Sequence, residues 1–171
     1  MSTVEANSSI LGESMTKDVL VSISGMQMDI LDRNLESEPI EVVTAGNYYL
    51  RNGKHYVLYD EVMEGVTGTI KNQIKITGTD TLEIIKTGIT NSHMIFEKNK
   101  TNQTYYKTPM GQMLVGIHTR NLDVSVFENH IDVKVDYELD VNHEPLADCK
   151  IRMNIMTKQG GKLDLRSHMP S

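Results

Sequence analysis

The segment IDVKVDYELDV, residues 131–141, constrains the fold more than any other stretch because its apolar residues recur at every second position. Successive side chains of a β-strand point to opposite faces, so this alternation predicts a strand with one dry face and one wet face. The apolar positions are Ile131, Val133, Val135, Tyr137, Leu139 and Val141, with Asp132, Lys134, Asp136, Glu138 and Asp140 between them.

The same period recurs along most of the chain, and no long segment shows helical spacing. Turn-forming residues separate the runs. The Asn52-Gly53 pair is the strongest hairpin signal, because a type I′ turn needs positive φ at both central residues. Glu128-Asn129 predicts a second tight hairpin. The further strands predicted in this way cover residues 19–31, 40–51, 54–62, 66–76, 81–87, 93–98, 103–107, 111–119, 121–127 and 148–157.

About eight to ten short strands joined by tight turns form either a sandwich or one sheet that closes on itself. Direct connections between neighbours favour an up-and-down antiparallel meander, and closure removes exposed sheet edges. We therefore predict an all-β protein in which a single meander closes into a barrel. A barrel of this size is filled by side chains or holds one small ligand.

The length of 171 residues favours a single domain. Residues 1–17 are polar, contain several serines and show no period, and the alternation ends after Thr157. We predict a flexible N-terminal tail over residues 1–17, a β-barrel domain over residues 18–157 and a C-terminal tail over residues 158–171.

Charge and composition disfavour several classes of protein. The formal net charge of −6 does not suit a nucleic-acid binder, which usually carries a basic patch. A single cysteine, Cys149, rules out an intramolecular disulfide and gives no sign of a zinc site. No apolar run is long enough to span a membrane, and no secretory signal precedes the strands. We expect a cytoplasmic protein with no membrane or nucleic-acid partner.

The stretch YYLRNGKHYVLYDE, residues 48–61, concentrates four tyrosines around the Asn-Gly turn. On its second strand Tyr56 and Tyr59 fall on opposite faces, and both faces mix apolar and polar residues. A buried tyrosine needs a partner for its hydroxyl, so either residue could act as a polar group inside a cavity. Tyrosine is also a common strand residue that packs across strands. Both interpretations stay open at this stage.

Residues with catalytic or metal-binding chemistry do not occur in a recognisable spacing. The six histidines show no metal-ligand pattern, and Cys149 lies in an apolar stripe where a thiol is usually inert. Asp60 and Glu61 are adjacent, so on a strand their carboxylates could not converge on one bond. We predict no metal and no cofactor. An enzyme is disfavoured; it would need His118 to converge with Tyr106 or Lys86 in one cleft.

Segments spread over residues 18–157 resemble, in order, the YwiB-like family of bacterial proteins. They are GNYYLRNGKHYVLYDE, TGTIKNQIKI, LEIIKTG, MIFEKN, YYKTPMGQMLVGIHT and VKVDYELDV. The most specific pieces are Tyr59 followed by Asp60-Glu61, Tyr106-x-Thr108 followed by Gly111, and Thr119. The chain has Lys86-Thr87-Gly88 where the family pattern has Arg-x-Gly, so a role that requires a guanidinium fork does not carry over.

The resemblance implies a small calycin-like, or lipocalin-like, β-barrel in the bacterial cytoplasm, with no established function. Kinship with calycins implies, by analogy of fold, a ligand in the barrel. We predict non-enzymatic binding of a small, largely apolar ligand in the barrel interior. The alternative is a structural or protein-interaction module, either a homodimer or a partner-binding protein, with a packed barrel. The ligand-binding candidates are Tyr56, Tyr59, Lys86, Tyr106, His118 and Thr119.

Overall fold

The computed structural model describes residues 16–25, 41–62 and 64–158, which form ten β-strands and no helix. Most of the two predicted tails, and residues 26–31 of the first predicted strand, lie outside the described residues. The strands are β1 (Lys17–Ser24), β2 (Glu41–Arg51), β3 (Lys54–Glu61), β4 (Ile70–Thr77), β5 (Thr81–Gly88), β6 (Ser92–Glu97), β7 (Lys100–Thr108), β8 (Gly111–Val126), β9 (His130–Val141) and β10 (Glu144–Thr157).

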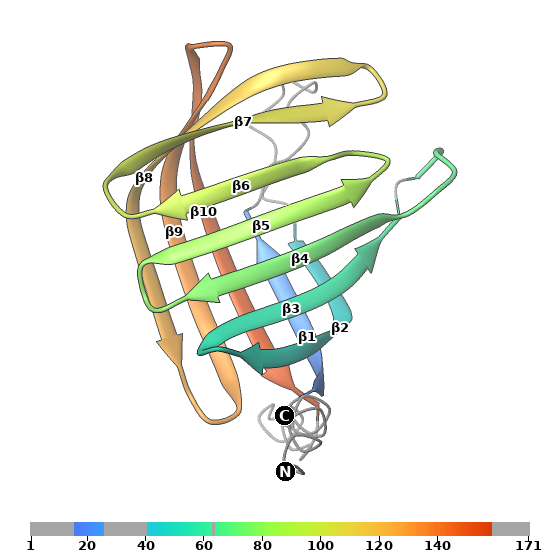
Figure 1. The fold of residues 1–171 in the computed structure, drawn as a ribbon, viewed down its shortest axis with the longest axis vertical. Helices are drawn as coiled ribbons and strands as arrows, with labels where there is room; N and C mark the ends of the chain where they lie inside the picture. Colours follow the sequence, from blue (N-terminus) through green and yellow to red (C-terminus); the bar gives the residue numbers. More distant parts are fainter. Residues whose placement is uncertain (1–15, 26–40, 63, 159–171) are drawn as a thin grey trace.

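The strands form one antiparallel sheet in the order β6-β5-β4-β3-β2-β1-β10-β9-β8-β7. Apart from β6 and β7, strands that follow one another in sequence pair with each other, and β1 pairs with β10. The outermost strands, β6 and β7, are joined by a turn and by a backbone pair between Asn91 and Lys107, with N···O distances of 3.0 and 2.9 Å. The sheet is therefore a nearly closed barrel (Figure 1).

The all-β meander predicted from the alternation is confirmed, and so is the type I′ hairpin. Asn52 and Gly53 have φ values of 53° and 77°. At the second predicted hairpin, the Phe127 amide donates to the His130 carbonyl over 2.8 Å, which closes a tight turn between β8 and β9. The turn between β9 and β10 is also tight, because Asn142 and His143 both have positive φ, at 50° and 72°.

The structure departs from the predicted strands in two places. The segments 111–119 and 121–127 are one long strand, β8, in which a bulge at Arg120 shifts the register. The extra residue moves the buried phase from Thr119 to Leu122. The strand predicted to begin at Val66 begins at Ile70, since Gly65 and Gly68 have φ values of 80° and 123°, which an extended strand excludes.

The middle of the barrel is filled by apolar side chains from eight of the strands, while β2 contributes only the half-buried Tyr48 and β7 only Tyr106. On β9 the alternating set from Ile131 to Leu139 is buried throughout. Phe96 of β6 packs edge-on against Tyr137 of β9, with ring centroids 5.0 Å apart and planes at 71°. An apolar middle leaves the ends of the barrel as the places where inward-pointing polar side chains meet solvent.

Candidate functional site

One end of the barrel carries a set of inward-pointing polar side chains. Alternate turns of a meander lie at the same end, so the β3–β4, β5–β6, β7–β8 and β9–β10 turns share this end (Figure 1). Tyr59 and Glu61 lie at the C-terminal end of β3, next to the β3–β4 turn, and Lys86 lies near the C-terminal end of β5. We call this the polar end.

Five of these side chains form a row that crosses neighbouring strands. Tyr59 pairs with Asn72, and Asn72 pairs with Lys86, which pairs with Ser92. The Asn91–Lys107 bridge, continued by one residue, places Ser92 opposite Tyr106 of β7. All five residues are buried. The polar row therefore consists of Tyr59, Asn72, Lys86, Ser92 and Tyr106.

Lys86 is the centre of the polar row. Its ammonium donates to the side-chain oxygen of Asn72 over 2.7 Å and to Glu61 Oε1 over 3.0 Å. The Asn72 amide nitrogen donates to the same Glu61 oxygen over 3.1 Å. Lys86 is only 5% exposed, whereas the Glu61 side chain is 38% exposed. A buried cation is thus held by one carboxylate at the boundary with solvent.

Two buried hydroxyls belong to Ser92, which pairs with Lys86, and to Thr90 of the β5–β6 turn. The hydroxyls of Ser92 and Thr90 are buried and have no hydrogen-bond partner in the part of the chain that the structure describes. Burial, and to a smaller extent the charge of Glu61, raises the pKa of Tyr59, so its hydroxyl stays protonated. Unpartnered buried hydroxyls are costly, which makes them groups that a ligand could satisfy.

Exposed apolar side chains lie in two of the turns at the polar end. Val62 and Val66 of the β3–β4 turn are 76% and 41% exposed, and Met110 of the β7–β8 turn is 78% exposed. These three residues, which we call the apolar rim, lie at the same end as the polar row because their turns alternate in the meander. An apolar rim above a few polar groups is the usual composition of a small-molecule site.

The structure brings together three of the residues that the sequence singled out. Tyr59, Lys86 and Tyr106 belong to the polar row. Thr119 is fully buried deeper in the barrel, where it pairs with Tyr137, and its hydroxyl has no hydrogen-bond partner among the described residues. The role of these four predicted residues in ligand binding stays a prediction.

Tyr56 and His118 lie on the outside of the barrel. The Tyr56 ring stacks on Tyr49 at a centroid distance of 4.8 Å and lies 5.8 Å from the Lys75 ammonium. The exposed His118 ring shares a 2.5 Å hydrogen bond with the Thr101 hydroxyl. Neither side chain points toward the polar row, because both belong to the outward phase of their strands.

Sequence reasoning missed Glu61, Asn72 and Ser92. A signal for Asn72 and Ser92 exists: each of three neighbouring strands has a polar residue where its buried apolar alternation reaches the same end. Asn72 follows the phase of Ile74 and Ile76, Lys86 that of Leu82 and Ile84, and Ser92 that of Met94 and Phe96. The pairing order of the strands was needed to align these interruptions.

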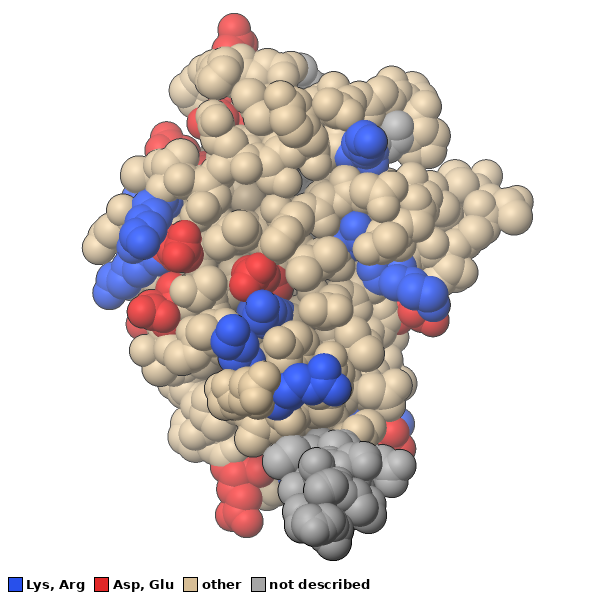
Figure 2. All heavy atoms as spheres, in the orientation of Figure 1, with Lys and Arg blue, Asp and Glu red and all other residues tan. Residues whose placement is uncertain are grey.

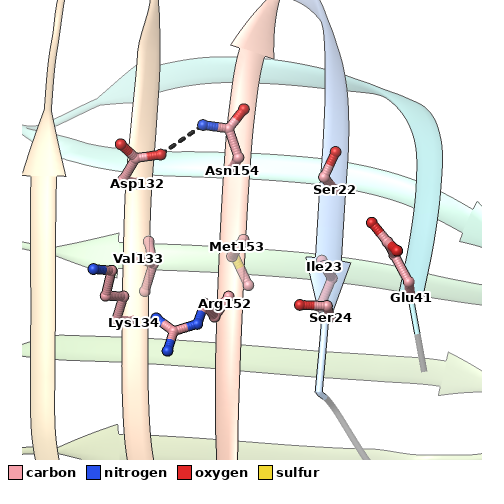
Figure 3. Close-up of a pocket in the computed structure, with 10 residues that line it drawn as sticks. All are labelled: Ser22, Ile23, Ser24, Glu41, Asp132, Val133, Lys134, Arg152, Met153 and Asn154. Atoms are coloured by element: carbon pink, nitrogen blue, oxygen red, sulfur yellow. Dashed lines mark hydrogen bonds between the residues drawn. The ribbon is translucent and has the colours of Figure 1, made fainter. Parts of the chain in front are cut away.

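Two hollows lie away from the polar row. At the opposite end of the barrel, Tyr48, Phe127 and Ile155 are among the residues that line a pocket of about 70 Å³. A groove of about 210 Å³ runs over the outer face of β9, β10, β1 and the start of β2 (Figure 3). Its polar residues carry both signs of charge, and Asn154 donates to Asp132 over 2.6 Å.

The face of the molecule shown in Figure 2 carries intermixed charges, with Lys and Arg beside Asp and Glu. Lys75 lies 3.8 Å from Glu83, and Lys71 lies 3.6 Å from Asp60. Within the described ranges, no three His, Cys, Asp or Glu side chains meet in a way that could hold a metal ion. None of the described residues belongs to a helix able to cross a membrane.

Residues 21–153 match the family described as Domain of unknown function (DUF1934). No curated protein sequence matches the chain. The crystal structure of ywiB protein from Bacillus subtilis is similar, with a TM-score of 0.68 and 17% sequence identity over 84% of this chain and 93% of that chain. At this identity the similarity establishes the shared fold alone. The family match spans most of the barrel, and the chain belongs to the DUF1934 family.

Proposed function

We propose that this protein binds a small, largely apolar molecule at the polar end of the barrel without transforming it. Lys86 carries the proposal, because a charged side chain that is 5% exposed lies where the apolar core ends. Removing a charge from water costs several kcal/mol, about as much as its ion pair returns. A barrel built only for stability would do as well with an apolar residue at this position, so the lysine fits a binding role better than a structural one.

The surroundings of Lys86 support the same function. The buried hydroxyls of Ser92 and Thr90 offer hydrogen bonds that no described residue takes up. The apolar rim provides surface for the remainder of a ligand. The proposal places the ligand at this end rather than in the middle of the barrel, where side chains such as Phe96, Tyr137 and Leu139 are fully buried in the core.

Native mass spectrometry of the freshly purified protein, compared with the denatured sample, tests the proposal. We expect a discrete extra mass that disappears on denaturation. Ser92→Leu, which fills the polar row, should remove this mass, whereas His93→Leu, one residue further and on the outer face, should retain it. Titration with the neutral fluorescent probe N-phenyl-1-naphthylamine covers a ligand lost in purification. A protein without extra mass that also binds no probe contradicts the proposal.

A second candidate, a homodimeric or partner-binding module, is favoured by exposed apolar residues at the start of β2. Val42 and Val43, adjacent on β2, are 37% and 56% exposed. Light scattering during size-exclusion chromatography over a hundredfold range of concentration distinguishes the two candidates. A dimer that Val43→Asp dissociates would favour the module, and a monomer at all concentrations would count against a homodimer.

A further inference from the structure

We infer that the ligand carries a carboxylate, which takes the place of the Glu61 carboxylate on Lys86. This inference rests on the proposed function and specifies the class of molecule that the polar end accepts: a monocarboxylate with an apolar body. Lys86 Nζ lies 3.0 Å from Glu61 Oε1 and 2.7 Å from the Asn72 side-chain oxygen. Glu61 thus shows which chemical group this end of the barrel already accommodates.

The two partners of the ion pair differ in their freedom to move. Glu61 is the last residue of β3, and its side chain is 38% exposed. Its carboxylate can therefore rotate away from Lys86 into solvent, where water hydrates it. The Lys86 side chain is 6% exposed and is confined by the neighbouring strands. The carboxylate of Glu61 is therefore the exchangeable partner, and the ammonium of Lys86 is the fixed one.

The donors around Lys86 match a carboxylate. The ammonium and the Asn72 amide nitrogen already donate to one carboxylate oxygen, that of Glu61. The buried hydroxyl of Ser92, the cross-strand partner of Lys86, is a further donor, and so is that of Thr90 two residues earlier; neither has a partner among the described residues. A carboxylate accepts several hydrogen bonds through its two oxygens, so it can use more of these donors than Glu61 does.

Charge balance favours a single negative charge. Lys86 is the one cation of the polar row, and Glu61 compensates it. Exchange of one carboxylate for another keeps the buried ammonium paired, which avoids the large cost of an uncompensated buried charge. A neutral ligand offers no such replacement, and a dianion would bring a second charge into a site with one cation. The ligand's apolar body would then contact the apolar rim.

Matched probes test the inference. Isothermal titration of the full chain at pH 7.5 compares octanoate with 1-octanol, and hexanoate with 1-hexanol, which differ only in the head group. We expect each acid to bind at least tenfold more tightly than its alcohol. Lys86→Met should abolish this preference. Glu61→Gln should tighten octanoate binding, because a neutral amide leaves the ammonium more readily than a carboxylate does. Lys75→Met, on the outer face, should change neither affinity.

Each outcome decides between the two levels of the proposal. Equal affinities for acid and alcohol would overturn the inference and leave the proposed function standing. If neither probe binds and the purified protein carries no extra mass, the proposed function itself fails. Should Lys86→Met not fold, Glu61→Gln decides, because an octanoate affinity no higher than that of the wild type contradicts the exchange.

Discussion

Glu61 and Lys86 form an ion pair of 3.0 Å although their strands, β3 and β5, do not pair with each other. The intervening strand β4 contributes Asn72, which hydrogen-bonds to both side chains. The three residues therefore act as one unit, in which removal of any member changes the surroundings of the other two. Such coupling is measurable as non-additivity.

Glu61→Gln should lower the free energy of unfolding by about 1–2 kcal/mol, since it leaves the buried Lys86 ammonium without a counter-charge; a fully buried pair would lose about 3–5 kcal/mol, and the exposure of Glu61 reduces the effect. Urea unfolding measures the change. In a Lys86→Met background the same substitution should cost less than half as much. Equal costs in both backgrounds would show that the two residues are not coupled.

Asp60→Asn is the matched control, because Asp60 is the neighbouring residue and its carboxylate lies 3.6 Å from the Lys71 ammonium on the outer face. Both side chains of that pair are largely exposed. Exposed ion pairs contribute about 0–1 kcal/mol, so this substitution should cost less than Glu61→Gln. The comparison separates the effect of burial from that of losing one negative charge.

Substitutions in the two Asn-containing hairpins should change the stability of the protein in opposite directions. Gly53 and His143 occupy the same turn position with φ values of 77° and 72°. A residue with a Cβ atom is strained there by about 1–2 kcal/mol. His143→Gly should therefore stabilise the protein by about 0.5–1 kcal/mol after glycine's entropy cost is subtracted. Thermal unfolding followed by circular dichroism checks this prediction.

Gly53→Ala is the converse variant and should destabilise the protein by about 1 kcal/mol. A Cβ atom at position 53 would meet no other atom within 4 Å, so the cost would come from the backbone alone. Stabilisation by Gly53→Ala would contradict the conformational argument for both hairpins.

Burial lowers the pKa of His55, whose Nδ1 atom lies 2.8 Å from the Tyr48 hydroxyl. Below the ordinary histidine pKa of about 6.5, the unfolded chain binds a proton that the folded protein still excludes. Stability should therefore fall as the pH drops from 6.5 toward the lower pKa of the folded state. The urea midpoint of the wild type should fall more between pH 7.5 and 5 than that of His55→Gln.

His118→Gln serves as the control for this pH dependence, because His118 is exposed on the outer face. It should show the same loss of stability on acidification as the wild type. If His55→Gln loses as much as the wild type, the buried imidazole is not the source of the effect.

The alternation was enough to predict the class of fold, because a period of two at residues 131–141 leaves one dry face to be buried. It could not show which face of β3 points inward. His55, Val57, Tyr59 and Glu61 share one face, which mixes charge with apolar surface as the other face does. The side chains that decide the matter, such as Lys86, come from other strands. The polar row thus depends on the order of strands rather than on any local motif.

Tyr56 shows why an aromatic on a mixed face is hard to assign from sequence. Its ring lies between Tyr49 and Lys75, and the Arg51 guanidinium lies 5.5 Å from the Tyr49 ring, so a cation covers each end of a stacked pair on the outer surface.

Cross-strand aromatic pairs contribute about 0.5–1.5 kcal/mol and exposed cation–π contacts about 0.5–1 kcal/mol. Tyr56→Thr, which keeps strand propensity, should therefore lower the free energy of unfolding by about 1–2 kcal/mol. Octanoate affinity should stay unchanged, since Tyr56 faces away from the polar row. Tyr59→Phe is the comparison on the inner face, where loss of one hydroxyl beside Glu61 should alter binding more than stability. A fall in octanoate affinity for Tyr56→Thr, measured by titration of the folded variant, would place the ligand on the outer surface instead.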